Sequence, residues 1–179
     1  MRIIIPLADG FDEFQASAVF SILRKARIDV VTAGVPATIV RGRHGMKLIA
    51  DKQLDEADYK TADGMVLVGG DSNESLERSE KLKQAIIELD GRKKIIGAVE
   101  NAPYLLARAG VLDDRVATIA AGMEKHLARP RTGRVIVDGH VVTAAGTPDS
   151  VELAIRIVEM AGKKAAASDI RKEFERHGS

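Results

Sequence analysis

The residue types best suited to chemistry lie around Glu100, between a mostly apolar run (Ile95–Val99) and Pro103. The run is long enough for a buried parallel strand, and proline is favoured at the first position of a helix. A strand that turns sharply into a helix lifts one side chain at the carboxyl end of a sheet, beside backbone N–H groups. Enzymes with this turn, a nucleophile elbow, normally carry serine or cysteine there, whereas this chain carries a carboxylate.

Two interpretations of Glu100 stay open on the sequence. It is either a solvated turn residue or a carboxylate held in a pocket as a ligand-binding group or a base. N–H groups at the helix start would stabilise its charge by about 0.3–1 kcal/mol. Gln15 also has two interpretations, which are compatible. Asp12 and Gln15 have the spacing of a capping box, and an amide at Gln15 can donate to a carboxylate that a second acid would repel.

Strands and helices are predicted to alternate along the chain, from apolar runs and from apolar positions at helical spacing. The alternation predicts an α/β fold with a mostly parallel sheet and helices on both faces. Ligands of such folds bind beyond the carboxyl ends of the strands. The predicted strands are Arg2–Ala8, Ile28–Ala33, Gly64–Val68, Ile95–Val99 and Val116–Ile119, with hairpins at 38–49 and 134–144. The predicted helices are Asp12–Arg27, Ser79–Leu89, Pro103–Gly110 and Thr147–Gly162, the last with Thr147 as its cap. Three loops are expected to converge on the rim, at 9–15, 69–74 and 100–103.

Composition narrows the classes of function. The chain has 179 residues, a net charge of +1 and no cysteine. The length suits one domain with a real core, and the charge argues against a nucleic-acid partner. No apolar run approaches the length of a membrane span and no signal peptide is evident, so we expect a cytoplasmic protein without a membrane partner. Without cysteine there is no thiol chemistry, and we expect neither a cofactor nor a metal site.

At these residues the chain resembles a known family. The segments Gly10-Phe-Asp-Glu-Phe-Gln15 and Val66-Leu-Val-Gly-Gly70, the elbow at 95–110 and the hairpin at 135–143 match the ThiJ/PfpI superfamily in order and spacing. This superfamily includes PfpI-like intracellular proteases and the parkinsonism-associated deglycases. The resemblance implies a flavodoxin-like three-layer sandwich of the class I glutamine amidotransferase-like type. It covers residues 1–162 and leaves 163–179 as a charged helical extension.

The resemblance also implies which residues occupy the family's site. The family places a reactive cysteine on the elbow, where Glu100 stands, and an acid that bonds to it on the first helix, where Gln15 stands. The N–H groups of Gly70 and Asn101 match an oxyanion-hole-like pair of the family. Glu74 matches an acid that reaches a neighbouring subunit's site. On the residues alone, Gly70 is also explained by a tight turn and Glu74 by a solvated helix start.

Without the cysteine, the protease, deglycase and glyoxalase activities of the family are not expected. Our hypothesis is a pseudoenzyme whose elbow pocket around Glu100 binds or senses a small molecule, or serves a chaperone-like role in the stress response. Glu100 with Gln15 would permanently imitate the charge pattern of a family cysteine oxidised to a sulfinate. The alternative is an enzyme of hydrolase or lyase type that uses Glu100 as general base or carboxylate nucleophile. Because the family is commonly oligomeric, a homodimer or higher homo-oligomer is expected.

Overall fold

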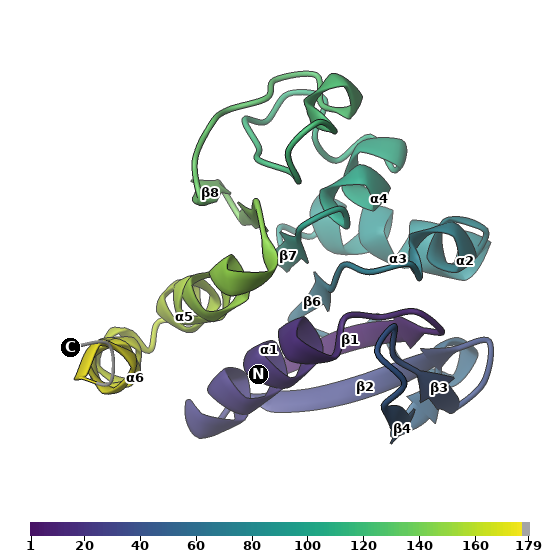
Figure 1. Cartoon of the computed structure of the whole chain (residues 1–179), viewed down its shortest axis with the longest axis horizontal. Coiled ribbons are helices and arrows are strands. Elements are labelled where there is room, and N and C mark those ends of the chain that lie inside the picture. Colours follow the sequence, from purple (N-terminus) through teal and green to yellow (C-terminus); the bar gives the residue numbers. More distant parts are fainter. Residues whose placement is uncertain (177–179) are drawn as a thin grey trace.

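A central sheet of seven strands organises the computed structural model, which describes residues 1–176 (Figure 1). The strand order is β5-β2-β1-β6-β7-β9-β8, and β8 alone runs antiparallel to its neighbour. The strands are β1 (Arg2–Ala8), β2 (Asp29–Val35), β5 (Lys52–Gln53), β6 (Gly64–Leu67), β7 (Ile95–Val99), β8 (Val135–Asp138) and β9 (Val141–Ala144). A separate hairpin pairs β3 (Ile39–Arg41) with β4 (Lys47–Ile49). The predicted α/β fold with a mostly parallel sheet is therefore confirmed.

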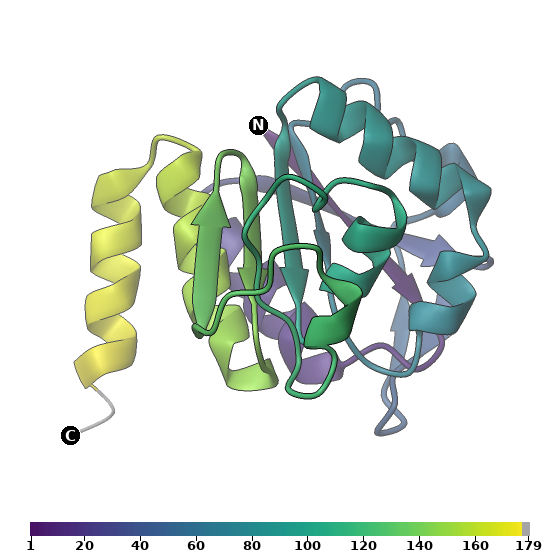
Figure 2. The same ribbon diagram turned by 90° about the horizontal axis from the view of Figure 1, so that it is seen from above.

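Helices cover both faces of this sheet and complete three layers (Figure 1). The helices α1 and α5 lie on one face and α3 and α4 on the other, while α6 packs outside α5 (Figure 2). The helices are α1 (Glu13–Lys25), α2 (Asn73–Glu77), α3 (Glu80–Gly91), α4 (Pro103–Arg108), α5 (Ser150–Met160) and α6 (Lys164–Arg176). Short 3₁₀ turns are η1 (Leu54–Glu56), η2 (Glu124–His126) and η3 (Thr147–Asp149).

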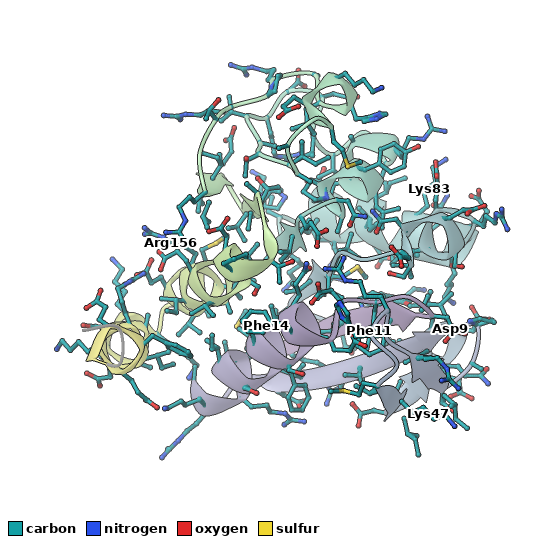
Figure 3. The ribbon with its side chains drawn as sticks, viewed as in Figure 1. Asp9, Phe11, Phe14, Lys47, Lys83 and Arg156 are labelled. Carbon is teal, nitrogen blue, oxygen red and sulfur yellow. The ribbon has the colours of Figure 1, made fainter. Side chains whose placement is uncertain are left out.

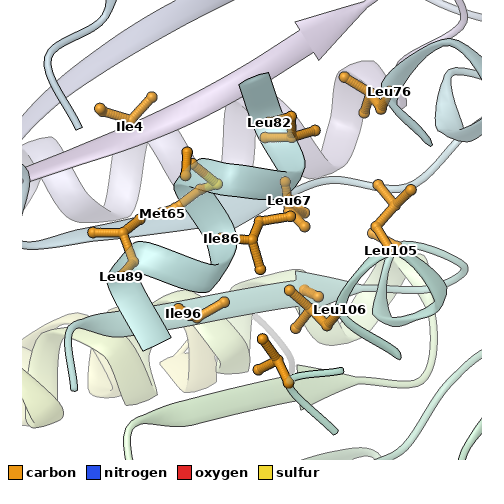
Figure 4. Packing of buried hydrophobic residues seen from close by; sticks show 14 of the residues in the cluster. Ile4, Met65, Leu67, Leu76, Leu82, Ile86, Leu89, Ile96, Leu105 and Leu106 are labelled. Carbon is orange, nitrogen blue, oxygen red and sulfur yellow. The ribbon is translucent and has the colours of Figure 1, made fainter. Parts of the chain in front are cut away.

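The core lies on both faces of the sheet because successive strand residues point to opposite sides. In β1, Ile3 and Ile5 pack towards α1 and α5, whereas Ile4 packs towards α3 and α4. Figure 4 shows the second side, where Leu82 and Leu106 from the helices meet the sheet. Burying each such side chain contributes about 1.5–3 kcal/mol. Because both faces of the sheet are packed in this way, the strands hold the loops at their carboxyl ends in fixed positions.

The first helix begins where the sequence predicts, directly after the loop that follows β1. The Asp12 carboxylate accepts a hydrogen bond from the Gln15 backbone N–H at 2.9 Å, which is the expected capping bond. Arg24 and Lys25 in the last turn complement the helix dipole. This capped start fixes the first turn of α1, and with it the Gln15 side chain, under the rim of the sheet.

Two predicted elements differ in the structure. The stretch Val116–Ile119 is not a strand, because the Thr118 N–H donates to the Thr143 hydroxyl and the chain makes only an isolated bridge between Ala117 and Pro130. Thr147 does not cap a helix. It begins the turn η3, and α5 starts three residues later, at Ser150. The Thr147 hydroxyl donates instead to the Glu100 carboxylate.

The last described element of the chain is a helix. Helix α6 occupies residues 164–176 and packs on α5 through Ala167 and Ile170, while 177–179 lie outside the described residues. The division into a domain at 1–162 and an extension at 163–179 stays a prediction. Within residues 1–176, no helix combines the length and apolar character that a membrane span requires.

Candidate functional site: the elbow at Glu100

Glu100 occupies the predicted sharp turn between β7 and α4. Its φ of 60° is in the left-handed region, a conformation that strains a residue with a side chain by about 1–3 kcal/mol. Two backbone hydrogen bonds hold it there: its N–H donates to the Ala144 carbonyl at 2.9 Å, and its carbonyl accepts from the Ala120 N–H at 2.8 Å. The elbow is thus fixed by β9 on one side and by the loop after α4 on the other.

The Glu100 carboxylate is held by side chains from three other segments. Its Oε2 atom accepts a hydrogen bond from the Gln15 amide and another from the Thr147 hydroxyl, the latter at 3.1 Å. Its Oε1 atom faces Arg43 Nη1 at 3.4 Å. Gln15 is fully buried, whereas the Glu100 side chain is 22% exposed. The carboxylate is therefore a partly accessible group in a fixed orientation.

Hydrogen bonds close a ring around the elbow. The Gln15 Oε1 atom accepts from the Gly69 N–H at 2.6 Å, and the Asn101 amide bonds to both backbone groups of Gly70, at 3.1 and 2.8 Å. The loops after β6 and β7 and the start of α1 are joined in this way. A Cβ atom at Gly69 would lie 2.7 Å from Asn101 Oδ1 and 3.0 Å from Glu100 Cβ, so this close approach requires glycine.

The Gly70 N–H does not have the role that the family resemblance implied. The Gly70 N–H donates to the Asn101 side chain, so it is not free to act in an oxyanion-hole-like pair. At the start of α4, the Ala102 N–H bonds to the Val99 carbonyl and the Tyr104 N–H to the Asn101 carbonyl. The donors found on the Glu100 carboxylate are the side chains of Gln15, Thr147 and Arg43.

Arg43 is a site residue that the sequence interpretation missed. It lies in the loop between β3 and β4, and its Nη2 atom is 2.5 Å from the Oδ2 atom of the buried Asp12. Its guanidinium therefore lies between two carboxylates, those of Asp12 and Glu100. The sequence predicted the hairpin, but spacing along the chain does not reveal which strand ends a hairpin loop will lie against. Three formal charges meet here and leave one negative charge in excess.

Glu13 holds the β3–β4 loop in place. Its buried carboxylate accepts hydrogen bonds from the His44 N–H at 2.7 Å, the His44 ring at 2.8 Å and the Met46 N–H at 3.4 Å. Burial disfavours the charged form, but these bonds and one to its own backbone N–H outweigh it and lower the pKa of Glu13 to about 2. A Cβ atom at Gly42 would lie 2.2 Å from the Glu13 side chain. The loop that carries Arg43 is thus docked on α1.

The site residues suggested by the sequence do not all come together. Glu100, Gln15, Asn101 and Gly70 meet as described, and Thr147 joins them although it was expected only to cap a helix. Glu74 is exposed on α2, pairs with Arg78 one turn later and forms neither a hydrogen bond nor an ion pair with the other four. Across residues 1–176, no group of histidine and acidic side chains is arranged to hold a metal ion. The assembled groups can fix a hydrogen-bond donor or a cation beside Oε1 of Glu100.

Comparisons with known proteins agree with this architecture. The model of the DJ-1/PfpI family matches residues 1–160. The chain is 34% identical over 167 residues to protein DJ-1 homolog B of Arabidopsis thaliana, covering 88% of this chain and 37% of the relative. It is 25% identical over 148 residues to a deglycase of Pyrococcus abyssi, covering 80% of this chain and 89% of that protein.

The solved structures give the same result. Oxidised DJ-1 of Toxoplasma gondii superposes with a TM-score of 0.92 at 26% identity, and 97% of each chain is covered. The chain spans 37% and 42% of the two Arabidopsis relatives, protein DJ-1 homologs B and A. By the match of its sequence and fold over nearly the whole described chain, this protein belongs to the DJ-1/PfpI family.

Proposed function

We propose that this chain is a family member without thiol chemistry, whose elbow pocket binds or senses a small molecule through Glu100. The observation that carries the proposal is the set of donors on the carboxylate: Gln15 and Thr147 on one oxygen and Arg43 on the other. A group held in this way is a fixed negative charge in the place of a family nucleophile. It supports binding, sensing or a chaperone-like stress role better than turnover.

The ligand favoured by this geometry carries a hydrogen-bond donor or a positive charge. Oε1 of Glu100 has one distant contact at 3.4 Å, and the group of Asp12, Glu100 and Arg43 has one negative charge in excess. A small amine, amide or alcohol would complete the hydrogen bonds of that oxygen. An anionic ligand would instead meet the carboxylate directly, at a cost of like-charge repulsion.

The test is a fragment screen by NMR on the isotopically labelled chain, beside its Glu100→Gln and Glu100→Cys variants. We expect small amines, amides or alcohols to shift the amide signals of Gly69, Gly70 and Asn101 in the parent. The affinity obtained from these shifts should fall at least about tenfold in Glu100→Gln, because one charged acceptor is lost. Equal stability and equal binding in all three proteins would overturn the proposal.

A catalytic role for Glu100 is the second candidate, and two relatives are named deglycases. A carboxylate can act as a general base on water or as a nucleophile at phosphorus or saturated carbon. Oε2 of Glu100 already accepts two hydrogen bonds, so Oε1, which faces Arg43 at 3.4 Å, is the oxygen that would take a proton. Turnover that falls at least about a hundredfold in Glu100→Gln would favour this candidate over the first.

We further propose that the chain forms a homodimer or higher homo-oligomer. Phe14 on α1 and Ile49 on β4 are 55% and 77% exposed, and Ile39 and Met46 of the same hairpin are also exposed. A groove of about 260 Å³ between α1 and this hairpin adjoins Ile49. Exposed apolar patches of this kind mark interaction surfaces, and a second copy would bury them.

Sedimentation velocity tests the oligomer. We expect the parent to sediment as a dimer or larger species and Phe14→Glu to shift towards the monomer. Phe174→Glu is the matched control, because Phe174 is 50% exposed on α6, which lies at the opposite end of the molecule from the β3–β4 hairpin (Figure 1). A monomeric parent, or equal behaviour of the two variants, would contradict this assembly.

A further inference from the structure

A second candidate site lies beside the elbow, on the same rim of the sheet. A cavity of about 610 Å³ opens between the loop of residues 117–134 and the turn that follows β9. Because β9 runs parallel to β7, this turn lies at the carboxyl end of the sheet, where α/β folds bind ligands. The loop arches away from the sheet between α4 and β8 (Figure 1). Part of the cavity wall is apolar, formed by Ile119 and Leu127.

The loop is rich in positive charge. Its segment 124–134 contains four cationic side chains and one carboxylate, that of Glu124, in a chain whose net charge is +1. Figure 3 shows nitrogen-tipped side chains projecting outward from this loop. The cationic side chains are Lys125, Arg129, Arg131 and Arg134. The cavity itself is lined by two of these arginines and by two carboxylates, those of Glu124 and Asp149, so its excess of positive charge comes from the rest of the loop, Lys125 and Arg129.

The Arg134 side chain is held through its Nε atom, and its two terminal nitrogens remain available within the described chain. Its Nε atom donates to the Asp149 carboxylate at 2.6 Å, and the Asp149 side chain is 9% exposed while that of Arg134 is 80% exposed. Both residues line the cavity. Among the described residues, the terminal nitrogens of Arg134 have no partner, so an oriented guanidinium can still bind an anion through them.

Arg131 is the unpaired cation of the cavity. Its backbone N–H donates to the Ala117 carbonyl at 2.8 Å, which fixes its place on the wall. Its side chain makes no hydrogen bond or ion pair with any residue of the described chain. A guanidinium binds carboxylate and phosphate through two parallel hydrogen bonds, which an ammonium group cannot do. Glu124 also lines the cavity, where its carboxylate would repel an anionic group and so favour a position beside the two arginines.

We propose that this cavity binds a small organic anion, a carboxylate or a phosphate monoester. Arg131 and Arg134 bind its charged group, and Ile119 and Leu127 contact its apolar part. This site is distinct from the Glu100 pocket and favours ligands of the opposite charge. The turn η3 separates the two, since Gly146 and Asp149 line the cavity while Thr147 donates to Glu100.

The test is an NMR titration of the full chain with phenyl phosphate and with benzoate at about 0.15 M salt, where exposed charges are screened beyond about 8 Å. Inorganic phosphate and acetate supply the charged group alone. We expect saturable shifts of amides in the 117–134 loop, with tighter binding of the aromatic probes. Whichever of phenyl phosphate and benzoate binds with the higher affinity identifies the charged group that the site prefers. Arg131→Gln should weaken binding at least about tenfold.

Arg129→Gln is the matched control. Arg129 lies on the same loop, but its guanidinium donates to the Asp114 carbonyl at 2.9 Å and it does not line the cavity. This variant should bind within about twofold of the parent. Equal losses in Arg129→Gln and Arg131→Gln, or shifts that do not saturate, would overturn the proposal and leave the role of Glu100 untouched.

Discussion

The elbow and the 117–134 loop lie side by side on one rim of the sheet, yet they use polar side chains in opposite ways. Around Glu100, the amide nitrogen and the amide oxygen of both Gln15 and Asn101 have hydrogen-bond partners within the chain. Along the loop, the Arg131 side chain has no partner among the described residues. Hydrogen bonds within the chain hold side chains in one orientation, whereas a charged side chain without a partner can still bind a ligand. The first region is therefore organised for positioning and the second for contact.

The largest effect is expected from Gln15→Glu, which would break the ring at the elbow. Two carboxylates would then meet at Glu100, and the pKa of one would rise above its unfolded value of about 4.5. The variant should lose about 2–4 kcal/mol relative to the parent at pH 7 and little at pH 4, where the shared proton restores a donor. Urea denaturation at several pH values measures this. A pH-independent difference would contradict the placement of Gln15 beside Glu100.

Gly42→Ala should disturb the docking of the Arg43 loop on α1. The added methyl group would collide with the Glu13 side chain, and overpacking of this kind costs about 1–3 kcal/mol. Gly91→Ala is the control, because a Cβ atom there meets nothing within 4 Å and alanine favours helix. Thermal unfolding compares the two. A destabilised Gly91→Ala with an unchanged Gly42→Ala would reverse the expectation.

Glu13→Gln should cost about 1–2 kcal/mol at pH 7, since hydrogen bonds to the charged acceptor are lost. The folded-state pKa of Glu13 is about 2, below its ordinary value of 4.5. The stabilisation by Glu13 is therefore complete above pH 4.5 and is lost as the pH falls towards 2. Parent and variant should converge over that window in urea titrations. A constant gap down to pH 2 would disagree with this pKa.

The smallest effect is expected on the loop. Arg131→Gln should change the free energy of unfolding by less than about 0.5 kcal/mol, as surface substitutions without partners do. Arg43→Gln, which would leave Asp12 and Glu100 without their shared cation, should cost more than Arg131→Gln by the same measurement. Equal effects would remove the contrast between the two regions.

Much of this fold could be predicted from the sequence because its signals are local. Asp12 caps α1 as its spacing indicates, and the apolar run before Glu100 is the buried strand that it resembles. The Val116–Ile119 stretch has strand-like composition, but its hydrogen bonds go to Thr143 and the loop, a tertiary outcome that local propensity cannot foresee. The capping role predicted for Thr147 was likewise inferred from local sequence alone, whereas its side chain bonds to Glu100, which is distant in sequence.

The candidate site was predictable only where one short segment defines it. The elbow at Glu100 follows from a single stretch of chain, and the compatibility of Gln15 with a carboxylate follows from hydrogen-bond chemistry. Arg43 joins them across 57 residues of sequence. The Asn101 side chain takes the Gly70 N–H, which no pattern along the chain reveals. A functional role stays a prediction for each residue of the candidate site: Glu100, Gln15, Gly70, Asn101 and Glu74.

Methylglyoxal consumption by the purified chain, beside Glu100→Gln, tests most directly whether the acid on the elbow has ended the thiol chemistry of the site. We predict that both proteins give the background rate, because neither offers a thiolate nucleophile at that position. A rate well above background in the parent that falls at least about a hundredfold in Glu100→Gln would contradict it.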